Sequence, residues 1–318
     1  MRNAYLETLY DLAQNDPCVL AMISDNGAIV YDKYRRDLPK QYINAGISEA
    51  NMVGMAAGLA ERGKIPFAYT IGAFLAYRAY EFIMNDVCLQ NENVKLVGIG
   101  EGVSYSLLGS SHHTIFDVPA LRALPNLTIL SPASPLEVKK CVHAAYEIQG
   151  PVYLRLGTNR EPEVYESANY DFEVGKGVVL KDGTDVTLVS TGSIVYDVLQ
   201  AAKALEAQGI STRVVNIHTL KPFDREIIIE SAAKTKAIVT VEEQTIYGGL
   251  GSMVAEVLAE EGIAIKFRRI GLTDFAHGYG KHDEVKEENG IGQDAVVSLI
   301  NLKYSRSKRS MRSDPCHN

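Results

Sequence analysis

No stretch of this 318-residue chain is apolar over the ~20 residues that a membrane-spanning helix requires. Cysteine is scarce: its four residues are widely separated, and no pair has the close spacing of a zinc knuckle, which excludes a disulfide-rich or zinc-finger framework. Positive charge is in deficit too, because 32 Lys and Arg residues face 39 Asp and Glu residues, for a net charge of −7. Such a chain is not expected to bind nucleic acid. We therefore expect a cytoplasmic protein with reduced thiols that binds neither membranes nor nucleic acid.

What the sequence does contain is a regular alternation of strand-like and helix-like segments. The first 16 residues have the pattern of an acidic amphipathic helix rather than that of a signal peptide. The alternation that follows predicts an α/β protein, with helices on both faces of a parallel sheet. The apolar runs that we assign to strands cover residues 19–23, 65–71, 94–99, 127–131 and 152–156, and then 186–191, 212–217, 237–242 and 265–270.

A charged, turn-rich and aperiodic segment, 157–177, interrupts this alternation and is interpreted as a linker. The sequence thus predicts two doubly wound domains, one over residues 1–165 and a smaller one over residues 172–302. The last segment, 303–318, is basic, polar and poor in apolar residues, and we expect it to be a disordered tail.

One carboxylate, Glu49, stands in a segment of small and apolar residues, 43–63, which is typical of a buried helix. A structural explanation is that Ser48 caps the helix while an acid in its first turn complements the helix dipole. The alternative is functional, because the helix begins after a short stretch at the carboxyl-terminal edge of the predicted sheet, where ligands bind in α/β folds.

Two further segments carry candidate chemistry. The loop 100–117 is rich in Gly and Ser and contains adjacent His112 and His113, which favours a role in proton transfer over a purely structural one. No third ligand has a spacing suited to zinc. The glycines of the segment 242–258 open a helix and resemble an anion-binding loop, but tight packing at a domain or subunit contact is the better interpretation.

Several long motifs occur in an order that resembles the carboxyl-terminal half of the transketolase family, which depends on thiamine diphosphate. The resemblance covers about residues 1–300 and implies a pyrimidine-binding domain followed by a transketolase carboxyl-terminal domain. The motifs are GISEANMVGMAAGLAERGKIPF (46–67), RAYEFIMNDVCLQNENVKLVG (78–98), SSHHTIFDVPALRALPNLTILSPAS (110–134), GPVYLRLG (150–157) and VEEQTIYGGLGS (241–252).

The resemblance assigns roles to cofactor-binding residues. In this family, the glutamate at the position of Glu49 hydrogen-bonds N1′ of the aminopyrimidine ring and favours the tautomer that removes the thiazolium C2 proton. A carboxyl group in apolar surroundings is able to share a proton with a ring nitrogen. The resemblance also implies that Phe74 stacks on the aminopyrimidine, that Tyr77 lines the same pocket and that Asp25 approaches the cofactor.

Substrate-binding residues follow by the same comparison. Arg78 matches an arginine that faces the substrate phosphate in deoxyxylulose-phosphate synthases, and His112 matches a loop histidine that contacts substrate oxygens and assists proton transfer. The resemblance thus implies that Glu49 and His112 are catalytic. We add His113 and Arg160 to the expected substrate-binding residues.

At three positions the chain departs from transketolases that act on sugar phosphates. Gly100 stands where they carry a second histidine, Leu108 where they carry an aspartate, and Thr158 where they carry a phosphate-binding arginine, with Arg160 two residues further on. Each replacement removes a group that binds hydroxyls or phosphate. A specialised sugar is therefore expected in place of the ordinary pentose phosphates.

The Gly-Asp-Gly stretch that binds the diphosphate and its magnesium in full-length transketolases has no counterpart here, since the DGT at 182–184 falls in the second domain. The resemblance therefore implies one subunit of a split, α2β2 enzyme. In such an enzyme a separate amino-terminal subunit would hold the diphosphate and the Mg²⁺, and no metal ligands are expected on this chain. Two alternatives remain: the beta subunit of a 2-oxo acid dehydrogenase, and a non-catalytic binding subunit that kept the fold. The segment 116–126 favours a transketolase over the dehydrogenase.

Overall fold

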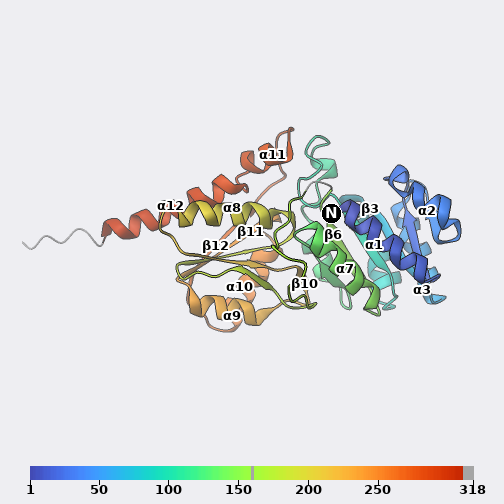
Figure 1. Cartoon of the computed structure of the whole chain (residues 1–318), viewed down its shortest axis with the longest axis horizontal. Coiled ribbons are helices and arrows are strands. Elements are labelled where there is room, and N and C mark those ends of the chain that lie inside the picture. The colour runs from blue at the N-terminus through green and yellow to red at the C-terminus, as the bar shows by residue number, and fades with distance from the viewer. Residues whose placement is uncertain (159–160, 311–318) are drawn as a thin grey trace, which may run out of the picture.

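The largely apolar runs of the first half form buried parallel strands, as expected for a sheet that helices cover on both faces. The computed structural model describes residues 1–158 and 161–310, which form two α/β domains (Figure 1). The first sheet has seven strands in the order β10-β5-β6-β4-β3-β1-β2. Its strands are β1 (Val19–Ile23), β2 (Tyr42–Asn44), β3 (Ile65–Ile71), β4 (Lys95–Ile99), β5 (Thr128–Leu130), β6 (Val152–Leu156) and β10 (Thr219–Lys221).

Helices pack on both faces of this sheet. Helices α1 and α7 contact each other and cover one buried core, and α3 to α5 cover a second core on the opposite face. The helices are α1 (Arg2–Asn15), α2 (Asp32–Asp37), α3 (Glu49–Glu61), α4 (Gly72–Arg78), α5 (Tyr80–Phe82), a π-helix (Ile83–Cys88), α6 (Asp117–Arg122) and α7 (Pro135–Glu147).

The second domain has a smaller sheet of five strands, in the order β12-β11-β8-β9-β7, with helices on either side. Its strands are β7 (Val178–Lys181), β8 (Val186–Ser190), β9 (Thr212–Asn216), β11 (Ala237–Thr245) and β12 (Lys266–Leu272). Its helices are α8 (Val195–Glu206), α9 (Arg225–Lys234), α10 (Leu250–Glu260), α11 (His282–Glu288) and α12 (Gln293–Ser310).

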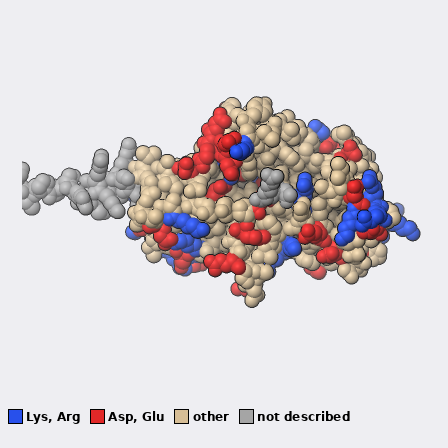
Figure 2. Space-filling view, turned by 45° about the horizontal axis from the view of Figure 1, so that its top comes forward, with Lys and Arg blue, Asp and Glu red and all other residues tan. Residues whose placement is uncertain are grey.

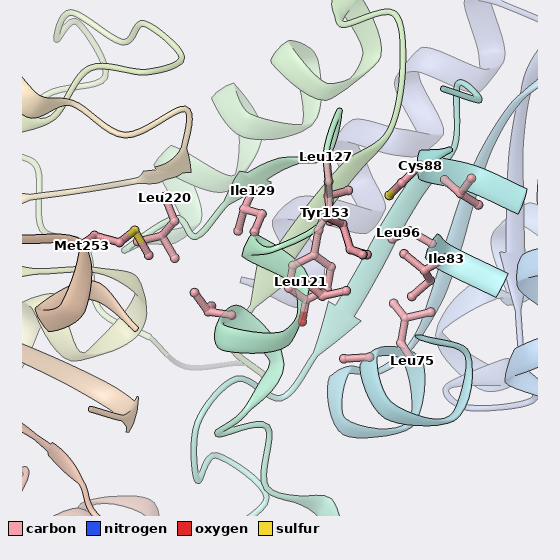
Figure 3. Packing of buried hydrophobic residues seen from close by; sticks show 14 of the residues in the cluster. Leu75, Ile83, Cys88, Leu96, Leu121, Leu127, Ile129, Tyr153, Leu220 and Met253 are labelled. Carbon is pink, nitrogen blue, oxygen red and sulfur yellow. The ribbon is translucent and has the colours of Figure 1, made fainter. Parts of the chain in front are cut away.

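The two domains share one hydrophobic core. The cluster in Figure 3 brings Leu220 and Met253 of the second domain close to Leu121 and Ile129 of the first. Strand β10, although it follows β9 in the sequence, pairs antiparallel with β5 of the first sheet. Each domain therefore buries part of its apolar surface against the other, and the relative placement of the domains is set by packing.

The structure corrects the sequence-based picture of the sheets in two places. Neither sheet is wholly parallel, because β10 and β7 pair antiparallel with their neighbours. Strands β2, β7 and β10 were not predicted, since three or four residues are too few to show a hydrophobic period. Helix α12 ends at Ser310, within the segment 303–318 for which a disordered tail was predicted. Residues 311–318 lie outside the described part of the chain.

Charged side chains of both signs are interspersed over the face seen in Figure 2. No helix among the described residues is long and apolar enough to cross a bilayer. Cys18, Cys88 and Cys141 are free thiols, and burial raises the pKa of Cys88 to about 11.

Candidate functional site

Glu49 is the first residue of α3, and its carboxyl group is buried at the carboxyl-terminal edge of the first sheet. The residue is 3% exposed. Its Oε1 lies 3.3 Å from the hydroxyl of Ser24, which follows β1, and that hydroxyl is 2.6 Å from Thr70 Oγ1 near the end of β3. Three neighbouring segments of the sheet edge thus position one carboxylate.

The capping explanation for Glu49 is wrong in its main part. The Ser48 hydroxyl donates to the carbonyl of Ala45 at 2.8 Å and makes no capping bond with α3. Helix α3 is also not buried all round, because Met55 on the helix is exposed, as is Ile47 just before it. A residue that only capped the helix would lie in solvent, whereas Glu49 is buried.

Arg78, at the end of α4, lies over the same carboxylate. Its Nη1 donates to Glu49 Oε2 at 3.1 Å, and its Cζ is 4.1 Å from the centroid of the Phe74 ring. The guanidinium is therefore a flat cation that stacks on an aromatic ring and donates to a buried carboxylate. An aminopyrimidine with a protonated ring nitrogen would make the same two contacts, so the residues present fit the pyrimidine part of thiamine diphosphate.

The His112 side chain joins this group from the loop Gly100–Asp117, which we call the His112 loop. Its ring meets that of Phe74 edge-on, with 5.0 Å between centroids, and its Nδ1 is 3.0 Å from the Ser111 hydroxyl. The structure thus brings together four predicted residues, Glu49, Phe74, Arg78 and His112, from three separate segments of the chain.

Other predicted residues lie at the margins of the group. The phenol of Tyr77 accepts the backbone N–H of Phe116 at 2.9 Å, so it ties α4 to the end of the His112 loop. Asp25 is exposed, with a left-handed φ of 62°. Its carboxylate accepts the side-chain amide of Asn44 at 3.0 Å, at the same edge of the sheet as Glu49.

His113 points into the protein interior. It is 2% exposed, and neither ring nitrogen has a hydrogen-bond partner among the described residues. Burial lowers its pKa, and it faces Glu243 and His282 of the second domain. Arg160 lies outside the described residues.

Sequence reasoning missed Tyr105 and Ser24. The ring of Tyr105 packs on Gly100, which has a φ of +84°, and a Cβ atom at position 100 would overlap that ring. Tyr105 also meets His112, with 6.3 Å between ring centroids. A tyrosine in a Gly- and Ser-rich loop was a usable signal, whereas nothing in the sequence distinguishes Ser24.

The glycine-rich turn before α10 does bind an anion, but the anion is the chain's own Glu242. Its carboxylate accepts the N–H groups of Leu250 at 2.6 Å and Gly251 at 2.8 Å. These two N–H groups are thus satisfied within the chain. The turn also packs at the contact with the first domain, where Arg122 donates to the carbonyl of Gly248 at 3.2 Å, as the packing interpretation expected. Within residues 1–158 and 161–310 no group of three or more His, Cys, Asp or Glu side chains is arranged to hold a metal ion.

Comparison with known proteins agrees with this geometry. Residues 1–161 match the pyrimidine binding domain of transketolase, and residues 175–296 match the transketolase C-terminal domain. An apulose-4-phosphate transketolase subunit of Phocaeicola vulgatus is 34% identical over 93% of this chain and 94% of the relative. A 6-deoxy-6-sulfo-D-fructose transketolase subunit of a Clostridium species is 37% identical, over 93% and 92%.

A solved structure, described as a split gene transketolase in an inactive beta4 tetramer, is 40% identical and superposes with a TM-score of 0.85, over 96% of this chain and 97% of the other. The alignments with these three proteins thus run nearly end to end. The chain belongs to the transketolase family, with the pyrimidine-binding and C-terminal domains that make up the second subunit of a split enzyme.

Proposed function

We propose that this chain supplies the pyrimidine half of the cofactor site in a two-subunit transketolase, which moves a two-carbon ketol unit from a ketose donor to an aldehyde acceptor. The observation that carries the proposal is the stacking of Arg78 on Phe74 and its hydrogen bond to Glu49. When bound, thiamine diphosphate supplies the carbanion that such a transfer requires. Glu49 would hold the ring nitrogen proton, and Phe74 would support the face of the ring.

The remaining residues of the group would act on the substrate. His112 lies against Phe74 and is half-buried, so its imidazole is in reach of hydroxyl oxygens and of a proton in transfer. Arg78 would leave Glu49 when the ring enters, and its guanidinium would then be free to meet an anionic group of the substrate. Asp25 and Tyr77 keep their proposed places at the margins of the site, and Arg160 stays a proposed substrate-binding residue.

The diphosphate and its Mg²⁺ would be held by a separate subunit in an α2β2 assembly. Support comes from the sequence, which has no Gly-Asp-Gly stretch of the expected kind, and from relatives that are named as subunits. The solved beta4 tetramer, which is described as inactive, is consistent with a chain that is active only with its partner.

The substrate that fits best is a specialised sugar. The place of the second histidine at position 100 is filled by the Tyr105 ring, and Leu108 presents an apolar side chain that is 51% exposed. These replacements remove hydrogen-bonding groups that would serve an ordinary pentose phosphate, at ~1–3 kcal/mol for each group left unpaired. Two relatives are named for unusual sugars, apulose 4-phosphate and 6-deoxy-6-sulfo-D-fructose.

A substrate panel tests this function. The chain is mixed with a diphosphate-binding subunit, thiamine diphosphate and Mg²⁺, and kcat/KM is measured with modified ketoses, with xylulose 5-phosphate plus ribose 5-phosphate, and with 2-oxo acids. We expect a modified ketose to give the highest value. Decarboxylation of a 2-oxo acid with transfer to a lipoyl group would instead identify a dehydrogenase subunit, and no turnover of any donor would indicate a non-catalytic subunit.

A further inference from the structure

The His112 loop meets the second domain at one buried carboxylate. Glu243 of β11 is 2% exposed, and its Oε1 accepts the backbone N–H of Val103 at 2.7 Å. The same oxygen lies 2.7 Å from Nε2 of His282, the first residue of α11. A carboxylate of one domain thus holds the backbone of the other domain's site loop, and a histidine holds that carboxylate.

A second carboxylate crosses the boundary in the opposite direction. Glu101, at the start of the His112 loop, accepts the N–H of Ser193 in the second domain at 2.7 Å. Both crossings need glycine, because a Cβ atom on Gly102 would overlap the Glu243 carboxyl group, and one on Gly192 would overlap that of Glu101. The two backbones therefore approach closely and are joined by reciprocal hydrogen bonds.

Further hydrogen bonds connect this contact to the rest of the His112 loop. Gly102, next to Val103, exchanges backbone hydrogen bonds with Thr114, at 3.0 and 2.8 Å, and so joins the two ends of the loop. The Ser106 hydroxyl donates to the carbonyl of Gly280 at 2.7 Å, two residues before His282. In Figure 1, α11 accordingly lies beside the His112 loop. Displacement of His282 would loosen the contact of Glu243 with Val103 and the nearby hydrogen bond of Ser106 with Gly280.

The charges around the pair favour its ionic form. Burial opposes ionisation of Glu243, but the nearby cations outweigh it and hold the pKa of Glu243 below its usual value. Burial also lowers the pKa of His282, but the Glu243 carboxylate outweighs that effect, and the pKa is raised above 6.5. Lys286 also faces the pair, and it pairs with Asp197 at 2.5 Å and with Asp283 at 3.0 Å. The remaining groups that face it are the buried Arg155, which donates to the Glu243 carbonyl at 3.3 Å, Glu101 and the buried His113.

We propose that Glu243 and His282 are positioning residues, which hold the His112 loop in the arrangement that the reaction requires. The inference rests on the proposed transketolase function, because it assigns the second domain a task at the site of the first. Neither residue touches the Glu49 group; they act through the backbone of Val103. Since the pKa is lowered for Glu243 and raised for His282, the ion pair is complete between these two pKa values and is lost as the pH rises through that of His282.

Hydrogen exchange of the full chain tests the loop contact without any turnover. We compare the wild type with His282→Ala, with His282→Gln, which retains an N–H donor, and with His143→Ala, which alters an exposed histidine on α7. In His282→Ala, amides of residues 100–112 should exchange about tenfold faster, because local opening is no longer opposed by the pair. His282→Gln should lie between, and His143→Ala should match the wild type.

Kinetics of the reconstituted enzyme supply the second readout. In the wild type, the KM for the ketose donor should rise by about tenfold at alkaline pH, as the loop carrying His112 loses its anchor. In His282→Gln this limb should be absent, because the amide does not titrate. Unchanged loop exchange in His282→Ala, or the same alkaline limb in His282→Gln, would overturn the assignment. If the proposed function failed, the wild-type complex would turn over no ketose. The hydrogen-exchange result would still decide the loop contact in that case.

Discussion

Arg78 donates a hydrogen bond to Glu49 across 3.1 Å, from a side chain that is half exposed to one that is almost wholly buried. A buried carboxylate needs a partner, and here that partner is able to leave toward solvent. The cofactor ring would take the place of the guanidinium on Phe74 and on the carboxylate, so the exchange of partners at Glu49 is the event from which catalysis would begin.

Glu49→Gln should leave the fold intact and slow turnover of the reconstituted enzyme by about 10²–10⁴-fold, because an amide has the same shape but cannot exchange the proton. The measurement is the exchange rate of the cofactor's C2 proton. Glu61→Gln, an exposed change at the other end of α3, is the matched control. A near-normal C2 exchange rate in Glu49→Gln would mean that Glu49 only opens the helix.

Arg78→Met should raise the KM for a phosphorylated ketose by about 10–100-fold, because a charge-assisted hydrogen bond to phosphate is lost. The KM for an unphosphorylated donor should change much less. Arg35→Met, which breaks only the exposed pair with Asp32, serves as the control. Equal effects on both donors would place Arg78 at the cofactor alone and not at the substrate.

Gly100→Ala should disturb the site through Tyr105. Gly100 and Gly63 are both left-handed, with φ of +84° and +78°, but only at Gly100 would a Cβ atom meet another side chain. In urea unfolding, Gly63→Ala should cost about 1–2 kcal/mol from backbone strain alone. Gly100→Ala should cost a further ~1–3 kcal/mol from overpacking and should also raise the donor KM, since Tyr105 contacts His112. Equal costs in the two variants would contradict this packing argument.

Stability should fall in acid partly because of His218. The residue is buried, its ring stacks on Phe172 with 4.5 Å between centroids, and burial lowers its pKa from 6.5 to about 4. The folded state therefore favours the neutral ring, which contributes stability above pH 6.5 that is lost as the pH falls through 4, up to about 3 kcal/mol. Urea unfolding at several pH values should show a shallower acid decline for His218→Gln than for the wild type. The same slope in both proteins would mean that His218 does not contribute to the acid decline.

Sequence patterns predicted the elements that bury both faces. The runs at 19–23, 65–71 and 152–156 became β1, β3 and β6 with the expected bounds, because a buried parallel strand is a largely apolar run, even though β6 also holds the buried Arg155. The short β10 could not be predicted from the sequence, since its partner strand β5 lies about ninety residues away in the chain and its own three residues are too few to show a hydrophobic period.

The candidate site divides in a similar way. Glu49, Arg78 and His112 were found because they lie within long motifs, and Phe74 because it lies close before one of them; the structure groups all four. Contacts that join distant segments, such as Ser24 with Glu49 or Glu243 with Val103, depend on the packing of two domains and leave no local signal. His113 is an example. Its adjacency to His112 suggested a shared role, but in the structure its ring faces Glu243 and His282 of the second domain.

The central claim is that this chain holds half of a cofactor site, and calorimetry tests it most directly. Thiamine diphosphate with Mg²⁺ is titrated into the isolated chain, and then into the chain mixed with a diphosphate-binding subunit. We expect weak binding or none to the isolated chain, because its sequence has no Gly-Asp-Gly stretch of the kind that binds the diphosphate, and tight binding to the mixture. Tight, magnesium-dependent binding to the isolated chain would contradict the claim.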